Sequence, residues 1–142
     1  MITHKIQTRV RYAETDQMGF VYYGNYAQYF EMGRVEALRS CGVSYKSLEN
    51  RGVMLPVVNL NVDFKSPGLY DDLLTITTCI NELPSVKIRF TYEVRNQSDQ
   101  LVATGETTLV FIDADSRRPM RCPEHVMDAL RNKAGDQPPF LA

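Results

Sequence analysis

The sequence has no apolar run that approaches the ~20 residues a membrane-spanning helix needs. Its N-terminus, MITHKIQTRVRY, has no apolar segment behind its basic residues, so a secretory signal is not expected. The three cysteines, Cys41, Cys79 and Cys122, are widely spaced and form neither a CxxC pair nor a Cys/His ligand motif. We therefore expect a cytoplasmic protein without a membrane segment, a disulfide framework or a metal site.

An excess of one charge is also missing. Sixteen Lys and Arg residues stand against 17 Asp and Glu residues, which leaves a formal net charge of -1. This balance gives no general field that attracts nucleic acid, so no nucleic-acid partner is expected. There is no GxSxG motif, and the two histidines, His4 and His125, lie near the chain ends. A serine or cysteine hydrolase triad therefore has no support.

The order of hydrophobic patterns predicts the secondary structure. Apolar or β-branched residues alternate with polar ones over Ile6–Tyr12, which indicates a half-buried strand. From Tyr23 to Cys41 the apolar residues gather instead on one face of a helix, and Gly42 suits its C-terminal cap. Gly33 lowers helix propensity, which favours a position where the helix packs closely on a sheet.

Alternation then returns and persists. Four further strands are predicted, over Val58–Phe64, Leu74–Ile80, Val86–Val94 and Leu101–Ile112. The last two form a hairpin through NQSD, and Pro123 opens a final short helix. An antiparallel sheet can bury one face on a helix, so we predict an α+β fold with about five strands on one long helix.

At 142 residues the chain suits a single domain, 1–142, with a flexible tail from about residue 134. One helix leaves part of the sheet edge and its polar face uncovered. We therefore expect pairing with at least one further subunit.

A polar, glycine-bearing loop over residues 13–26, AETDQMGFVYYGNY, lies between the first strand and the helix. Functional residues favour such loops. Asp16 would have free backbone N–H groups of the helix start nearby, and these donors can stabilise an oxyanion. An Asp before a helix more often caps or ties the turn. The pattern by itself leaves both roles open.

Residues 15–26, TDQMGFVYYGNY, resemble the TD-x-x-G-x-V-[YW]-[YH]-x-N-Y signature of the 4-hydroxybenzoyl-CoA thioesterase and YbgC-like branch of the hotdog superfamily. The resemblance extends through FEMGRVEALRSCG, NLNVDFKSPGLYDDLLTI and LVFIDADSRRPMRCP, from Ile6 to about Leu130. It implies a hotdog fold, with a curled sheet around a central helix. It also implies hydrolysis of an acyl-CoA thioester without metal or cofactor, coenzyme A being part of the substrate, by a homodimer or a dimer of dimers.

The resemblance also implies roles for loop residues. Asp16 matches the family's catalytic aspartate, either a nucleophile that forms a mixed anhydride or a general base that deprotonates water. The backbone N–H of Tyr23 would point at the thioester oxygen, and Gly19 would let the loop approach the acyl group. Asn25 matches the family asparagine, whose amide could orient Asp16 or the water, or could cap the helix.

Coenzyme A carries phosphates, so its site should offer Lys or Arg side chains. The basic candidates are Lys65, Lys87, Arg89, Arg117 and Arg118. Lys65, Ser66 and Pro67 lie in FKSPG, which resembles the family's strand-end segment near the nucleotide. Ordinary surface charge is the alternative for each basic residue.

Glu31, Arg34 and Glu36 of the predicted helix also carry charge. Glu31 and Glu36 compete with Asp16, because another hotdog branch carries its carboxylate on the helix. Both lie off the buried face, which favours solvated surface. Arg34 lies within that face and predicts a structural ion pair with a carboxylate or a carbonyl partner.

Two other functions stay open. A thioesterase for acyl groups on acyl carrier protein would need a basic docking surface, and a hotdog protein could bind acyl-CoA without hydrolysis. A dehydratase of this fold would be expected to carry a histidine on the helix, and none lies between Tyr22 and Cys41. The acyl group itself is not defined. The aromatic residues suit an aromatic or a short aliphatic group, or simply the core, namely Tyr22, Tyr26, Tyr29, Phe30 and Tyr45.

Overall fold

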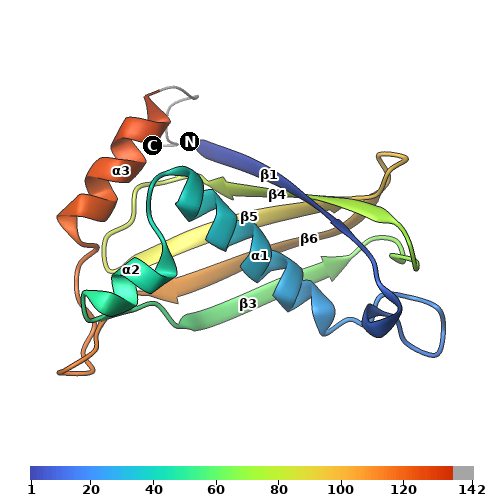
Figure 1. Ribbon diagram of the computed structural model, residues 1–142, viewed down its shortest axis with the longest axis horizontal. Coiled ribbons are helices and arrows are strands. Elements are labelled where there is room, and N and C mark those ends of the chain that lie inside the picture. Colours follow the sequence, from blue (N-terminus) through green and yellow to red (C-terminus); the bar gives the residue numbers. More distant parts are fainter. Residues whose placement is uncertain (136–142) are drawn as a thin grey trace.

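A computed structural model of the chain describes residues 1–135 and contains a five-stranded antiparallel sheet of order β1-β4-β5-β6-β3 (Figure 1). The strands are β1 (Ile2–Arg9), β3 (Val57–Phe64), β4 (Leu73–Ile80), β5 (Lys87–Arg95) and β6 (Leu101–Val110). A 16-residue helix, α1 (Asn25–Ser40), lies across one face of the sheet. The predicted α+β class, the five-stranded antiparallel sheet and the β5–β6 hairpin are thereby confirmed.

Shorter elements complete the described chain. They are the 3-10 turn η1 (Tyr12–Glu14), α2 (Tyr45–Asn50), β2 (Val53–Met54), β7 (Ile112–Asp113) and α3 (Glu124–Ala134). No helix within residues 1–135 is long and apolar enough to cross a membrane. Residue 134 still belongs to α3, and the rest of the predicted flexible tail, 136–142, lies outside the described residues.

The first strand begins and ends earlier than its pattern indicated. We predicted Ile6–Tyr12, but β1 runs from Ile2 to Arg9 and pairs with β4 over that length. Val10 is buried as the alternation requires, whereas Tyr12 is 75% exposed. The chain turns into η1 at this point, because the Glu14 N–H bonds back to the Arg11 carbonyl at 3.0 Å. Alternation in the sequence therefore outlasts the strand.

Helix α1 packs closely on β4 at Gly33, as predicted. A Cβ atom at this position would lie 3.0 Å from Cγ2 of Ile76 and closer still to the hydroxyl of Thr78. The helix begins at Asn25 rather than at Tyr23, and ends at Ser40. Gly42 follows with φ of +87°, the left-handed conformation that favours glycine after a helix.

A second glycine, Gly105 on β6, receives the ring of Phe30 from α1. A Cβ atom at Gly105 would clash with this ring and would lie 2.8 Å from the backbone oxygen of Asn61 on β3. Phe30 is fully buried, and its ring stacks on that of Tyr92 with centroids 4.2 Å apart. These contacts fix the depth at which α1 lies on the sheet.

Strand β3 is an edge strand, and among the strands of residues 1–135 it pairs only with β6. It is found where the alternation predicted it, but its apolar side chains remain uncovered in a single chain. Val58 is 53% exposed, Leu60 45% and Phe64 56%. This edge therefore combines apolar side chains with unpaired backbone groups.

Arg34 is buried on α1 as predicted, with 7% exposure. Its Nε–H donates to the hydroxyl of Tyr45 at 3.1 Å. No carboxylate of residues 1–135 lies within ion-pair distance of its guanidinium, so the predicted structural ion pair is wrong for this chain. The physical reason is that α2 places a phenol oxygen where the charged partner was expected.

Candidate active site

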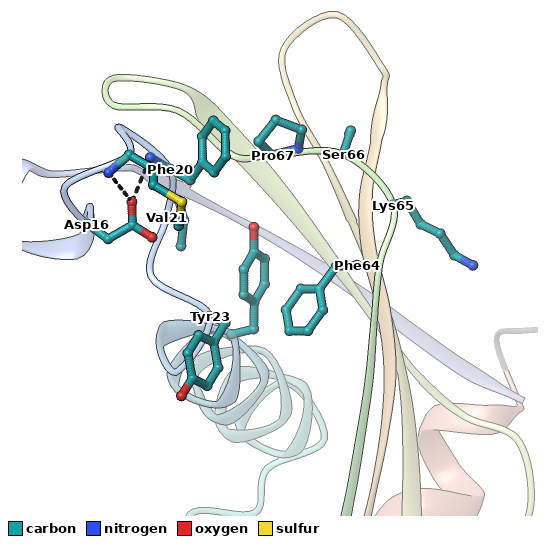
Figure 2. A pocket seen from close by; sticks show the side chains of 10 residues that line it. Asp16, Phe20, Val21, Tyr23, Phe64, Lys65, Ser66 and Pro67 are labelled. Carbon is teal, nitrogen blue, oxygen red and sulfur yellow. Dashed lines mark hydrogen bonds between the residues drawn. The ribbon is translucent and has the colours of Figure 1, made fainter.

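The carboxylate of Asp16 is held by the turn that it begins. Its Oδ1 accepts the backbone N–H groups of Met18 at 2.9 Å and of Phe20 at 3.2 Å (Figure 2). The Asp16 N–H donates to the Phe20 carbonyl at 2.8 Å, which closes the turn. Oδ2 has no hydrogen-bond partner among the described residues. Asp16 therefore ties the turn with one oxygen and leaves the other free.

Gly19 makes this turn possible. Its φ is +82°, a conformation that side-chain-bearing residues rarely adopt, and its N–H donates to the Asp16 carbonyl at 3.0 Å. A Cβ atom there would meet nothing within 4 Å. The backbone angle, rather than lack of space, is thus the local reason for glycine.

Asp16 lies at the edge of a cavity of about 330 Å³ between the loop and the end of β3. The cavity is lined by Asp16, Met18, Phe20, Val21, Tyr23, Tyr26, Phe64, Lys65, Ser66 and Pro67 (Figure 2). Its two walls are tied together where the Val21 N–H donates to the Gly68 carbonyl at 2.8 Å. Burial raises the pKa of Tyr26, so this phenol stays neutral. The result is a mostly apolar cavity with one carboxylate at its edge.

Within residues 1–135, two unpaired N–H groups lie immediately before α1. Gly24 is the N-cap and supplies no capping side chain. The Tyr22 N–H donates to the Glu14 carbonyl, but those of Tyr23 and Gly24 have no partner among residues 1–135. Tyr23 lies one residue before the N-cap, and its unpaired N–H is available to a bound oxyanion. Tyr23 lines the cavity together with Asp16.

Asn25 lies in the first turn of α1, but its amide does not contact Asp16. The Nδ2–H donates to the Glu14 carbonyl at 2.8 Å. Because Gly24 occupies the N-cap, the alternative of a capping role for Asn25 is wrong. The amide instead joins the helix to the residue two positions before Asp16.

The Lys65–Pro67 segment forms the wall opposite Asp16. Lys65 is exposed, and Figure 2 shows its side chain pointing away from Asp16. The Ser66 hydroxyl donates to the Leu101 carbonyl at 2.6 Å, which fixes this segment to β6. Lys65 therefore carries its charge at the rim of the cavity.

The four other basic candidates do not reach this cavity in one chain. On β5, Lys87 pairs with Val110 and Arg89 with Thr108, at the far end of β6 from Ala103, the partner of Phe64. Arg89 is also paired with Glu106 at 3.4 Å. Arg117 and Arg118 follow β7, which pairs with β2 in a separate two-stranded sheet. Sheet order, which the sequence does not reveal, separates them from Asp16.

The competing carboxylates on α1 also lie elsewhere. Glu31 is exposed and Glu36 is paired with Arg39, and neither lines the cavity with Asp16. Sequence reasoning missed Phe20, Phe64 and Glu14, which is 8% exposed. Phe20 could have been identified as a cavity residue, because it is an apolar residue within a polar loop. No pattern marked Glu14. No group of three or more His, Cys, Asp or Glu side chains within residues 1–135 could hold a metal ion.

Residues 10–130 match the Thioesterase-like superfamily. YneP of Bacillus subtilis is 33% identical over 121 residues, which span 85% of this chain and 88% of YneP. The acyl-CoA thioester hydrolase YbgC of Escherichia coli is 29% identical over 119 residues, or 84% of this chain and 89% of YbgC.

A crystal structure of a 4-hydroxybenzoyl-CoA thioesterase mutant in complex with 4-hydroxybenzoyl-CoA has a TM-score of 0.82 to this chain at 25% identity. The match covers 91% of this chain and 99% of that one. The resemblance inferred from residues 15–26 is therefore confirmed over nearly the whole length, and the chain belongs to the Thioesterase-like superfamily.

Proposed function

We propose that the protein hydrolyses the thioester of a small acyl- or aroyl-CoA to the free acid and coenzyme A, with Asp16 as the reacting carboxylate. One observation carries the proposal. The free Oδ2 of Asp16 and the unpaired N–H of Tyr23 belong to residues that line one apolar cavity. A nucleophile or base beside an oxyanion donor is the pair of groups that acyl transfer needs.

The chemistry follows one of two routes. As a nucleophile, Asp16 attacks the thioester carbonyl, the C–S bond breaks to release the coenzyme A thiolate, and water then hydrolyses the mixed anhydride. As a general base, Asp16 takes a proton from water while the water oxygen attacks the same carbonyl, and the C–S bond then breaks to release the coenzyme A thiolate and the free acid. In both routes the carbonyl oxygen becomes an oxyanion, which the Tyr23 N–H stabilises. Neither route uses a metal or a resident cofactor.

The cavity supports a small or aromatic acyl group. Phe20 and Phe64 line it, and the ring of Phe64 meets that of Tyr26 edge-on with centroids 5.4 Å apart. Aromatic walls favour offset or edge contacts with a further ring. Lys65 at the rim would bind a phosphate of coenzyme A, since a flexible ammonium group serves as a point charge for phosphate.

Thiol release from acetyl-, palmitoyl-, benzoyl- and phenylacetyl-CoA tests this proposal. We expect the wild type to turn over at least one of these substrates, and the aromatic or short ones faster than palmitoyl-CoA. The same acyl groups on acyl carrier protein serve as the comparison. Faster release from the carrier protein would favour the carrier-protein thioesterase. Binding without release from either carrier would favour an acyl-CoA-binding protein.

We further propose that the chain works as a homodimer, or a dimer of dimers, paired through β3. A second copy that added its own β3 antiparallel to this edge would satisfy the unpaired backbone groups and cover Val58 and Leu60. Antiparallel pairing sets the Phe64 end of one β3 beside the Val57 end of the other. The partner's Lys87 and the partner's Arg89 would then lie nearer to this cavity than the same two residues of this chain.

Leu60→Lys is expected to weaken this association by at least ~100-fold, because the interface would bury an unpaired charge. Light scattering coupled to size exclusion measures the mass in solution. Leu69→Lys is the matched control, since Leu69 is 46% exposed but lies outside β3. A dimer that survives Leu60→Lys at low concentration would show that β3 is not the interface.

A further inference from the structure

A buried carboxylate lies two residues before Asp16. Glu14 is 8% exposed and does not line the cavity. Its Oε1 accepts the Arg11 backbone N–H at 2.9 Å and the Tyr29 hydroxyl at 3.2 Å. Its Oε2 lies 3.3 Å from the exposed guanidinium of Arg11. Burying a carboxylate is costly unless its oxygens are paired, so these contacts account for how Glu14 is accommodated.

The backbone of the same residue holds the far end of the loop. The Glu14 carbonyl accepts the Tyr22 N–H at 2.9 Å and the Asn25 Nδ2–H at 2.8 Å. Tyr22 immediately precedes Tyr23, the proposed oxyanion donor. Glu14 is thus bonded to the loop's exit and to the first turn of α1, while its side chain reaches Tyr29 one turn further on.

We infer that Glu14 is a positioning residue, which fixes the Asp16 loop on α1 and so sets the Asp16 carboxylate relative to the Tyr23 N–H. This inference rests on the proposed function and deepens it. Its reference point is rigid, because Tyr29 is fully buried beneath the helix. Burial, reinforced by the Glu14 charge, raises the pKa of Tyr29, so the hydroxyl keeps its proton and remains a donor.

Misplacing a reacting group by about 1 Å can cost ~100-fold in rate. A loop released from Tyr29 would therefore slow the chemical step. The cavity wall formed by residues 64–67 has no hydrogen bond to Glu14. Substrate binding should consequently change much less than turnover.

Glu14→Leu and Tyr29→Phe are each expected to lower kcat by roughly 10- to 100-fold and to leave KM within about threefold. The double variant should lose little more than Glu14→Leu alone, because Glu14→Leu already removes the contact that Tyr29→Phe breaks. Glu14→Gln keeps an acceptor oxygen for Arg11 and Tyr29. Glu14→Gln should therefore retain most of the wild-type kcat. If the negative charge of Glu14 mattered instead of its acceptor oxygen, Glu14→Gln would lose kcat as Glu14→Leu does.

Tyr92→Phe is the matched control. It removes another buried phenol hydroxyl, one bonded to Thr107 on the sheet at 2.5 Å, away from the loop. It should lower thermal stability about as much as Tyr29→Phe and leave kcat unchanged. Equal kcat losses in Tyr92→Phe and Tyr29→Phe would indicate a general stability effect and would overturn the assignment.

Amide hydrogen exchange tests the assignment independently of activity. Glu14→Leu and Tyr29→Phe should speed exchange at Met18 and Phe20, whose N–H groups bond to Asp16, and Tyr92→Phe should not. If the wild type hydrolyses no thioester, the proposed function fails, and exchange still decides whether Glu14 holds the loop. Unchanged exchange with unchanged kcat would overturn the positioning role while leaving the hydrolase intact.

Discussion

Asp16→Asn is expected to lower kcat for thioester hydrolysis by at least ~100-fold, the effect of losing a nucleophile or general base. The change is nearly isosteric. The amide oxygen can still accept the N–H groups of Met18 and Phe20, so the turn should keep its shape. Oδ2, the oxygen without a partner, becomes an NH2 group. An NH2 group can neither attack a carbonyl nor accept a proton from water.

Steady-state thiol release under matched conditions gives the comparison. Asp115→Asn is the control, because Asp115 is exposed in the turn after β7 and lies outside the cavity. It should retain wild-type kcat, and both variants should melt close to the wild type. If Asp16→Asn remains fully active on a substrate that the wild type hydrolyses, Asp16 is a turn residue only and the reacting group lies elsewhere.

Gly105→Ala is expected to lower the free energy of unfolding by about 2 kcal/mol, within the range for overpacking a core. Alanine would normally favour folding slightly over glycine by restricting the unfolded chain. Here its Cβ would meet the buried ring of Phe30 and lie 2.8 Å from the Asn61 backbone oxygen. Neither neighbour can give way easily, since Phe30 stacks on Tyr92 and Asn61 belongs to the adjacent strand. The steric cost therefore outweighs the gain from restricting the unfolded chain, and the free energy of unfolding falls.

Thermal unfolding should show this as a fall in Tm of roughly 6 °C for a chain of this size. Gly135→Ala is the control, because a Cβ there would come no closer than 3.4 Å to the other residues of 1–135 and φ is not positive. It should change Tm by less than ~1 °C, as surface substitutions usually do. Adding Phe30→Leu to Gly105→Ala should recover part of the loss, which a clash elsewhere would not allow. An unchanged Tm in Gly105→Ala would contradict the contact.

Periodicity was enough to predict the five strands of the main sheet and helix α1, but not their ends. The 3.6-residue pattern placed α1 correctly because its buried positions are spaced by the contact with the sheet. It set the start at Tyr23 rather than at Asn25, since a tyrosine fits the pattern equally well when its ring is exposed. The alternation that ran to Tyr12 failed for the related reason that η1 continues it by chance. A hydrophobic pattern shows which residues are polar or apolar. The residue at which a helix or strand ends depends instead on the backbone turn that follows it.

The candidate site could be predicted where it is local in the sequence. Asp16, Gly19 and Tyr23 belong to one loop, and Lys65–Pro67 to one strand end, so each group was found as a unit. The distance of Arg89 from the cavity of its own chain could not be predicted, because it depends on β3 lying next to β6 rather than on any neighbour in the sequence. Glu14 was missed because a carboxylate looks solvated unless the phenol that binds it, Tyr29, is known to lie opposite.

The turn that begins at Asp16 also affects how such a protein can diverge. The carboxylate is held by the backbone N–H groups of residues 18 and 20, which every amino acid except proline provides. The side chains of Met18 and Phe20 face the cavity instead. Substitutions at these two positions can therefore reshape the space offered to the acyl group while the carboxylate keeps its support. A lineage with this turn can explore new substrates by single mutations without first losing its chemistry.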